Sequence, residues 1–491
     1  MPALKILFAT SEVAPLIKTG GLADVSGALP AALRAIGVDV RVLVPGYAQV
    51  IAQLAQHKVA ATFVNLPGFP PARLLSGKMA NGVPLLVLDC PVLYQRAGGP
   101  YQDASGRDWA DNAQRFGLLS KVAAVLGSGE SPLRWHPDLV HCNDWQTGLT
   151  PAYLHFLRGA APSVITIHNM AFQGNFAPAT VKELGLPPSC FAIDGVEFYG
   201  NMSFLKAGLF YADHITTVSP NYAKEIQQPE LGFGMQGLLA TRSSDLTGIL
   251  NGIDTGEWNP ATDHHLNKKY SASRMTGKAA NKESLQSRMG LNLEPDVPLL
   301  GVVSRLTHQK GLDLLIEIAP RLVGLPAQLT ILGSGDAAMQ QAARDLSFRY
   351  PGKIGAYIGF SEELSHLIEA GADMFVMPSR FEPCGLNQLY SQRYGTPPIV
   401  HATGGLADSV VDCNEATLKN GTASGFAFNG MAAENLFTAI QRAVDLYQDR
   451  KKWKTLCKNC MSKDFSWESS AEAYRAVYLK VLGLKVLGRQ G

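Results

Sequence analysis

The sequence predicts two α/β domains, each built on a mostly parallel β-sheet with helices on both faces. The first observation is length, because a chain of 491 residues is too long for one compact core. The second is that short apolar runs alternate, in both halves of the chain, with segments whose apolar residues recur at helical spacing. The third is that polar side chains follow several apolar runs directly, as they do where parallel strands end at a ligand site.

The predicted strands of the first domain are short and apolar. They cover Ile6–Ala9, Val40–Val44, Leu85–Leu88, Leu139–His141, Val164–Ile167, Ile215–Val218 and Leu246–Leu250. Asp144, His168 and Asn251 each follow one of them. Since the carboxyl ends of parallel strands lie at one edge of a sheet, these residues are candidates for one site, although each is also a common turn former.

The stretch from Ser11 to Pro30 connects the first strand to a predicted helix through Lys18, Thr19, Gly20 and Gly21. A strand, a glycine loop and a helix N-terminus together form a common anion-binding arrangement. Lys18 opposes the helix dipole at a cost of roughly 0.3–1 kcal/mol, and a bound phosphate would reverse that sign. The alternative is a solvated lysine beside a flexible turn.

The second half repeats the alternation after a turn-rich segment, Asp254 to Asp263, that is predicted to be a linker. Its strands are expected at Leu299–Val303, Gln328–Leu332, Ile354–Ile358, Met374–Met377 and Pro398–Val400, with helices at Gly311–Val323 and Asp336–Arg349. A final helix starts near Trp467 and carries an apolar stripe that needs a packing partner, consisting of Trp467, Ala471, Tyr474, Tyr478 and Val481. We expect domains at residues 1–255 and 256–463, and a C-terminal helix at 464–491 that crosses back to the first domain.

Cations and a carboxylate follow the strands of the second domain. Arg305 and Lys310 span a short strand-to-helix loop and could converge on one diphosphate, or simply solvate that loop. Glu382, in the segment RFEPCGL, could accept sugar hydroxyls or face water. Cys384 is not favoured as a nucleophile, because the neighbouring carboxylate opposes thiolate formation. Thr403, Gly404 and Gly405 repeat the glycine loop before a helix and form another candidate phosphate nest.

Other features exclude classes of function. The net charge of +2 argues against nucleic acid or an anionic membrane as the main partner. No run approaches the roughly 20 apolar residues of a membrane helix. Seven scattered cysteines fit reduced thiols in a cytoplasmic protein. The dinucleotide fingerprint at Gly333 to Ala338 lacks the acidic residue expected after the next strand, so an NAD site is not favoured. No metal-ligating motif is present, and we expect no metal and no cofactor.

Seven motifs in order carry a family resemblance. KTGGLADVSGALP, HCNDWQTG, TIHN, LNGID, SRLTHQKG, SRFEPCGLNQLY and TGGLADSV resemble those of the bacterial glycogen synthases and plant starch synthases. The resemblance implies a GT-B fold, with two Rossmann-like doubly wound domains facing each other across a cleft. It also implies a hexosyltransferase that moves glucose from ADP-glucose to the non-reducing end of an α-1,4-glucan, with retention of configuration and without a metal.

The resemblance also implies roles for individual residues. His168 matches the histidine beside the glucosyl group, Glu382 the glutamate that holds its hydroxyls, and Arg305 with Lys310 the pair that neutralises the diphosphate. Lys18 matches the donor-binding lysine of the KTGGL motif. The expected substrate-binding positions are Glu12, Lys18, Gly20, Gly21, Asp24, Asp144, Asn251, Cys384, Gly385, Leu386, Thr403, Gly404 and Gly405. Tyr390 stands where some related enzymes carry a second glutamate, so ribose contacts cannot be inferred from those relatives.

Two alternatives remain open from the sequence. One is a related retaining transferase that uses another nucleotide sugar or acceptor. The other is a non-catalytic glucan-binding protein, which would have no use for three cations directed at a diphosphate. Sequence physics does not distinguish ADP from UDP, and it does not indicate acceptor length, regulation or oligomeric state.

Overall fold

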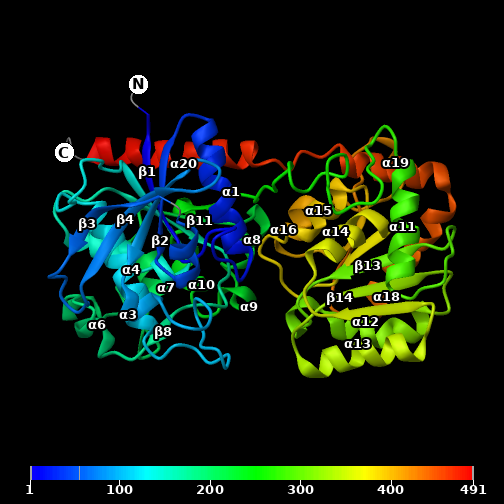
Figure 1. Cartoon of the computed structure of the whole chain (residues 1–491), viewed down its shortest axis with the longest axis horizontal. Coiled ribbons are helices and arrows are strands. Elements are labelled where there is room, and N and C mark those ends of the chain that lie inside the picture. Colours follow the sequence, from blue (N-terminus) through cyan, green and yellow to red (C-terminus); the bar gives the residue numbers. More distant parts are fainter. Residues whose placement is uncertain (1–2, 55, 489–491) are drawn as a thin grey trace. The chain divides into compact units, whose positions relative to one another are not determined.

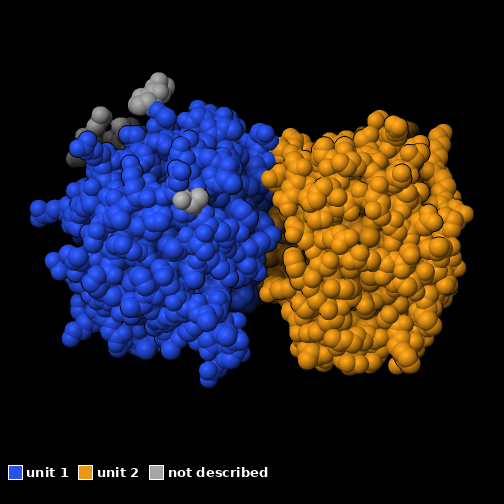
Figure 2. Space-filling model, viewed as in Figure 1, with its two compact units in different colours: residues 1–252, 467–491 blue, residues 253–466 orange. Residues whose placement is uncertain are grey.

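The computed structural model describes residues 3–54 and 56–488. The chain forms two compact units, of which unit 1 comprises residues 1–252 and 467–491 and unit 2 comprises residues 253–466 (Figure 2). The chain therefore passes from one unit to the other twice. The chain enters unit 2 at Ile253 and leaves it after Ser466, and these two points are neighbours. Ile253 forms a parallel bridge with Ser466, and its N–H donates to the carbonyl of Phe465 at 2.8 Å.

Unit 1 is built on a nine-stranded sheet in the order β12-β11-β7-β6-β1-β2-β5-β4-β3, as far as the described residues show (Figure 1). The strands from β12 to β5 are parallel, which confirms the predicted fold class. Their bounds are β1 Lys5–Ala9, β2 Asp39–Pro45, β5 Pro84–Asp89, β6 Leu139–Asn143, β7 Ser163–Ile167, β11 His214–Thr217 and β12 Leu246–Gly248. Every residue of β6 and β7 is buried, as expected when helices cover both faces of a parallel sheet.

Two antiparallel strands at one edge of this sheet were not predicted. They are β3 (Lys58–Phe63) and β4 (Ala72–Lys78), and β4 pairs with β5. β3 lies at the sheet edge and has only one buried residue, so it lacks the apolar run by which the buried strands were recognised. A separate small sheet contains β8 (Asn175–Phe176), β10 (Asn201–Ser203) and β9 (Glu197–Phe198).

The helices of unit 1 connect these strands. They are α1 Gly21–Ala35, α2 Ala48–Gln53, α3 Pro91–Tyr94, α4 Asn112–Leu126, α5 Thr150–Phe156, α6 Thr180–Glu183, α7 Phe204–Tyr211, α8 Pro220–Glu225, α9 Pro229–Gly232, α10 Gln236–Thr241 and α20 Trp467–Gly488. α20, drawn in red, lies beside α1 in Figure 1. Its predicted stripe is buried, and the hydroxyl of Tyr478 lies 2.7 Å from Nδ1 of His141 in the centre of the sheet. None of the described helices is long and apolar enough to cross a bilayer.

Unit 2 contains an all-parallel six-stranded sheet in the order β15-β14-β13-β16-β17-β18. Its strands are β13 Leu299–Val303, β14 Gln328–Gly333, β15 Ile354–Ile358, β16 Met374–Met377, β17 Pro398–His401 and β18 Phe426–Phe428. Its helices are α11 Thr276–Arg288, α12 Leu312–Leu322, α13 Ala337–Arg349, α14 Glu362–Gly371, α15 Asn387–Arg393, α16 Gly404–Ser409, α17 Glu415–Lys419, α18 Ala433–Gln448 and α19 Arg450–Met461. The strands expected from the sequence are all present, and β18 is an addition.

The segment from Asp254 to Asp263 is not the free linker that its turn-rich sequence suggested. It belongs to unit 2, where the ring of Trp258 stacks on His366 and on Tyr390 with centroid distances of 3.9 and 3.8 Å. Asp263 is buried and accepts a hydrogen bond from the Tyr394 hydroxyl. Stacking and buried hydrogen bonds give this segment its order without any periodic pattern that a sequence could display.

Gly333 and Gly335, which resemble part of a dinucleotide-binding fingerprint, have a packing role. A Cβ atom on Gly333 would lie 1.9 Å from the carbonyl oxygen of Ser304, and one on Gly335 would lie 2.5 Å from that of Leu306. The loop after β14 therefore lies directly against the loop after β13, on both sides of Arg305. This contact explains the glycines without a bound dinucleotide.

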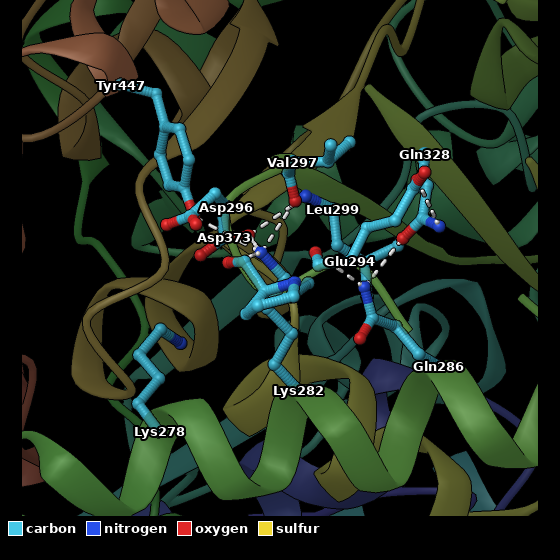
Figure 3. Close-up of polar contacts among 12 residues, drawn as sticks. Lys278, Lys282, Gln286, Glu294, Asp296, Val297, Leu299, Gln328, Asp373 and Tyr447 are labelled. Atoms are coloured by element: carbon cyan, nitrogen blue, oxygen red, sulfur yellow. Dashed lines mark hydrogen bonds and ion pairs between the residues drawn. The ribbon is translucent and has the colours of Figure 1, made fainter. Parts of the chain in front are cut away.

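A buried polar network lies at the amino ends of the strands of unit 2. Lys282 extends from α11 and donates to the carbonyl of Val297 at 2.6 Å and to Asp373 at 2.7 Å, while Gln286 donates to Gln328 at 2.7 Å (Figure 3). Asp373 also accepts from the N–H of Leu299, the first residue of β13. These buried charges therefore hold α11 to the starts of the strands, away from the carboxyl ends where a ligand is expected.

Candidate active site

The strongest candidate site in unit 2 joins the loops that follow β13 and β16. Nζ of Lys310 lies 2.5 Å from Oε2 of Glu382, and the Ser379 hydroxyl donates to the same oxygen at 3.0 Å. The two charged side chains are 17% and 8% exposed, so this is a largely buried ion pair beside the carboxyl ends of the strands. Two of the predicted site residues are thus in direct contact.

Backbone contacts bring the two loops together. Gly311, which follows Lys310, has a φ of +68°, and a Cβ there would lie 1.9 Å from the carbonyl oxygen of Pro378. The N–H of Arg380 donates to the carbonyl of Gln309 at 2.8 Å. The Arg380 guanidinium forms two hydrogen bonds to Asp313, at 2.7 and 2.6 Å, and these lower the pKa of that carboxyl. Only glycine permits this approach, so the glycine after Lys310 is needed to place the lysine beside Glu382.

Arg305 lies on the loop after β13 and is exposed. Among the residues that the structure describes, its guanidinium has no ion-pair or hydrogen-bond partner. The backbone on either side of it is held against the β14 loop by the close contacts at Gly333 and Gly335. A cation held at a strand end without a counter-ion is suited to binding an anion.

The glycines after Thr403 pack against the Glu382 loop. Cβ atoms on Gly404 and Gly405 would lie 2.0 Å from the carbonyl oxygen of Glu382 and 2.1 Å from that of Cys384. The N–H of Gly405 already donates to the carbonyls of Glu382 and Pro383, each at 3.1 Å. The Gly405 amide is therefore used within the protein, where it helps to fix the backbone of Glu382, and the predicted nest at residues 403–405 stays a prediction.

The adjoining residues complete this wall of unit 2. Cys384 is buried, and Gly385 has a φ of +70° that turns the chain into α15. Leu386 precedes α15 and packs on a cluster that contains Leu389 and Tyr390. Tyr390 is buried and stacks on Trp258, so it has a packing role.

In unit 1, Glu12 organises the loop that contains Lys18. Its buried carboxylate accepts hydrogen bonds from the N–H of Thr19 at 2.5 Å, from the Thr19 hydroxyl at 2.7 Å and from the hydroxyl of Tyr101. Burial, reinforced by the Glu12 charge, raises the pKa of Tyr101, so the phenol keeps its proton and remains the donor. Glu12 therefore positions the loop from within the protein.

The loop itself presents Lys18, Gly20 and Gly21. Nζ of Lys18 lies 2.6 Å from Asp24, with side-chain exposures of 55% and 28%. Burial raises the pKa of Asp24, and the neighbouring Lys18 partly offsets this effect. A Cβ on Gly20 or Gly21 would meet no atom within 4 Å, and neither residue has a positive φ. Gly20 is the N-cap of α1, a position that suits glycine, and the open space around both glycines leaves room at this helix start.

Asp144 and His168 meet at the carboxyl ends of β6 and β7. Oδ1 of Asp144 accepts hydrogen bonds from the N–H groups of His168 and Asn169, at 2.6 and 3.4 Å. Burial, with a contribution from the Glu12 charge, raises the pKa of Asp144 to about 7, while burial lowers the pKa of His168 to about 3. The imidazole is therefore neutral, with Nε2 3.0 Å from Oδ1 of Asn143.

Asn251 is a predicted site residue of unit 1 that follows β12. Its side chain is buried, and Oδ1 has no hydrogen-bond partner among the described residues. A buried carbonyl oxygen without a donor costs free energy, and a ligand hydroxyl could satisfy it.

Several residues of these networks were not among the predicted site residues. Tyr101, Asn143, Ser379 and Arg380 hold Glu12, His168, Glu382 and the Lys310 loop, respectively. Asn143 follows a predicted strand and Arg380 belongs to the RFEPCGL segment, so both carried a local signal. Tyr101 lies in an irregular loop and carried none.

The chain has two α/β units, each with a mostly parallel sheet, and cations and carboxylates lie at the strand ends. This is the architecture of a glycosyltransferase of the GT-B class. Residues 5–241 match the family described as "Starch synthase catalytic domain", and residues 285–458 match "Glycosyl transferases group 1". The chain is 59% identical over 480 residues to the glycogen synthase of Nitrosomonas eutropha, covering 97% of this chain and 96% of that one. It is 56% identical over 489 residues to the glycogen synthase of Nitrosospira multiformis, covering 99% and 98%.

Solved structures agree with this result. The catalytic domain of starch synthase IV from Arabidopsis thaliana, bound to ADP and acarbose, matches with a TM-score of 0.86 and 31% identity over 98% of this chain and all of that one. Sucrose-phosphate synthase from Thermosynechococcus elongatus, at 17% identity and a TM-score of 0.58, shares the fold. The chain belongs to the glycogen synthase and starch synthase family, and its activity is that of a hexosyltransferase.

Proposed function

We propose that this enzyme transfers glucose from ADP-glucose to the non-reducing end of an α-1,4-glucan, with retention of configuration and without a metal. The observation that carries the proposal is the ion pair of Lys310 with Glu382, on the same strand-to-helix loop as Arg305, an exposed cation without a partner among the described residues. A diphosphate leaving group accumulates negative charge in the transition state, and without a metal the protein must supply the compensating charge. Unit 2 is thus the donor side, and unit 1 the acceptor side.

The family resemblance suggests the individual roles, and the contacts within each unit support them. Arg305 and Lys310 bind the diphosphate, and Glu382 accepts hydrogen bonds from glucosyl hydroxyls while it orients Lys310. Lys18 supports the donor from the glycine loop, where Gly20 and Gly21 leave room for it. Neutral His168 contacts the glucosyl group. The bond from the anomeric carbon to the diphosphate breaks, the acceptor hydroxyl attacks from the same face, and its proton passes to the leaving diphosphate.

We also place the reaction in the cytoplasm. All seven cysteines are buried thiols, which is in keeping with a reducing compartment. The substrates we assign are ADP-glucose and glycogen, with no nucleic acid or membrane partner.

The first experiment compares nucleotide sugars. Purified protein is incubated with glycogen and radiolabelled ADP-glucose or UDP-glucose, and the label in the polymer is counted. We expect a clearly higher kcat/KM for ADP-glucose. Equal or preferred use of UDP-glucose would favour the related transferase with another donor.

The second experiment tests the cations. We expect Arg305→Ala to lower kcat by an amount corresponding to roughly 2.7–4 kcal/mol, the cost of losing one contact to developing charge. Since Arg305 is exposed, thermal stability should not change. Lys310→Ala should lower kcat as strongly, and it should also destabilise unit 2 because Glu382 loses its buried partner. Arg344→Ala, which removes an exposed arginine of α13, is the matched control. Wild-type turnover in both test variants would refute the assignment.

A further inference from the structure

A second cluster of charged and imidazole side chains lies in unit 2 outside the candidate active site. His265 follows the buried Asp263, and Glu362 and His366 stand one turn apart on α14. One ligand atom from each of these three residues lies within 4.8 Å of the others. The glycosyl-transfer mechanism uses none of them.

His366 is held in one orientation. Its side chain is 1% exposed, its ring stacks on Trp258, and its Nδ1 lies 2.8 Å from Oδ2 of Asp263. The Tyr394 hydroxyl also donates to Oδ2 of Asp263. This oxygen is therefore an acceptor, and Nδ1 of His366 carries the proton that it accepts.

The other ring nitrogen of His366 is then a lone-pair donor. Nε2 is buried and has no hydrogen-bond partner in the described part of the chain. A buried nitrogen without a partner is costly, and here it belongs to the residue that shares a cluster with His265 and Glu362. A carboxylate that orients a histidine through Nδ1 while Nε2 binds a metal is a recurrent arrangement at zinc sites.

We propose that His265, Glu362 and His366 bind a divalent transition-metal ion of the Zn²⁺ type, with Asp263 orienting His366. Two imidazoles and one carboxylate suit Zn²⁺, whereas Mg²⁺ and Ca²⁺ prefer oxygen ligands alone. The three protein ligands leave a coordination position for water. The site goes beyond the proposed glucosyl transfer and does not depend on it.

Metal binding requires a small movement of the His265 and Glu362 side chains, whereas His366 can stay in place. Zn–N and Zn–O bonds of about 2.0–2.2 Å need ligand atoms closer together than 4.8 Å. His366 is fixed, but Glu362 is exposed and His265 is half-buried, so these two side chains can close around the ion. A bound ion then links helix α14 to the segment around His265, near the start of unit 2. Its effect is to stabilise unit 2.

The test measures metal binding on the untagged full-length protein after chelator treatment and dialysis. ZnCl₂ is titrated by calorimetry and by competition with a chromophoric chelator, and thermal unfolding is followed with and without the ion. We expect one Zn²⁺ per chain and a higher unfolding temperature, with no effect of MgCl₂. His265→Ala and Glu362→Gln should each weaken Zn²⁺ binding at least about tenfold and abolish the thermal shift.

His264→Ala is the matched control, because His264 is the exposed neighbour of His265 and is outside the cluster. It should bind Zn²⁺ like the wild type. Absence of stoichiometric binding, unchanged binding in both test variants, or equal loss in the control would each overturn the proposal. Glucosyl transfer should be the same in all these proteins and after chelation, so failure of this site is distinguishable from failure of the proposed function.

Discussion

Burial sets the protonation of the two residues that meet at the strand ends of unit 1. Asp144 has a pKa raised to about 7, and His168 has a pKa lowered to about 3. A carboxyl whose pKa is higher in the folded state stabilises the fold at low pH, and this contribution is lost as the pH rises from about 4 to about 7. The histidine acts in the opposite direction, because only the unfolded chain binds its proton between about 6.5 and 3.

Asp144→Asn should isolate the first effect. Asp144 has a φ of +54°, which asparagine tolerates, and the amide oxygen can still accept from the N–H of His168. We expect the variant to gain stability relative to the wild type as the pH rises from 4 to 7. The gain should reach several kcal/mol, since one pKa unit corresponds to about 1.4 kcal/mol. Urea unfolding of both proteins across this range measures it, and parallel pH curves would contradict it.

Two predicted glycine loops differ in the reason for their glycines, and alanine distinguishes them. At Gly404, with a φ of +45°, a Cβ would meet the Glu382 carbonyl, so Gly404→Ala should destabilise unit 2 by more than about 2 kcal/mol. At Gly20 a Cβ meets nothing, so Gly20→Ala should leave stability within about 1 kcal/mol and lower kcat/KM. Thermal unfolding and transfer assays measure both; equal stability of the two variants would refute the distinction.

At the scale of the element, α11 contributes the buried charge of Lys282, which stabilises unit 2. Lys282 is 5% exposed and Asp373 is 13% exposed, and the pair joins α11 to the starts of β13 and β16 (Figure 3). Lys282→Met leaves Asp373 without its cation, and breaking such a pair costs roughly 3–5 kcal/mol. We expect unit 2 to unfold at lower denaturant concentration, while turnover per folded molecule is unchanged.

The exposed Lys454 of α19 provides the control for this element. Lys454→Met removes the same charge from the surface and should shift the unfolding midpoint little. A loss of turnover in folded Lys282→Met protein would place the network in the catalytic machinery instead.

At the scale of the whole molecule, α20 completes unit 1 although it comes last in the sequence. Tyr474 and Tyr478 are fully buried, and Tyr478 reaches His141 on β6. Removing everything after Ser466 exposes apolar surface worth several kcal/mol at roughly 25 cal/mol per Å². We expect lower solubility, with glucosyl transfer lost more than nucleotide binding because Arg305, Lys310 and Glu382 lie in unit 2.

Two point variants test separately the buried and the exposed faces of α20. Tyr478→Phe removes only the hydroxyl that contacts His141 and should weaken unit 1 by about 1 kcal/mol. Arg475→Ala alters the exposed face of α20 and should have little effect. A truncated protein that is soluble and fully active would show that unit 1 does not need the helix.

The sequence by itself determined the fold class, the order of the parallel strands along the chain and the family. Buried parallel strands read as apolar runs, and loop residues at their ends remain local in sequence, so both can be recognised from a few consecutive residues. Arg305, Lys310 and Glu382 could be selected in this way. The edge strand β3 and the segment around Trp258 could not, because an exposed edge and an irregular segment have no distinguishing period.

Only the tertiary structure decided which of these residues touch. The pairing of Lys310 with Glu382, the support of Glu12 by Tyr101, and the approach of His265 to His366 all join segments that are distant in the sequence. Such contacts depend on close backbone packing, as at Gly311 and Gly404, and on burial that sets the charge of Asp144 and His168. Residue types and spacing do not encode those distances locally, because they arise from the packing of all the elements together.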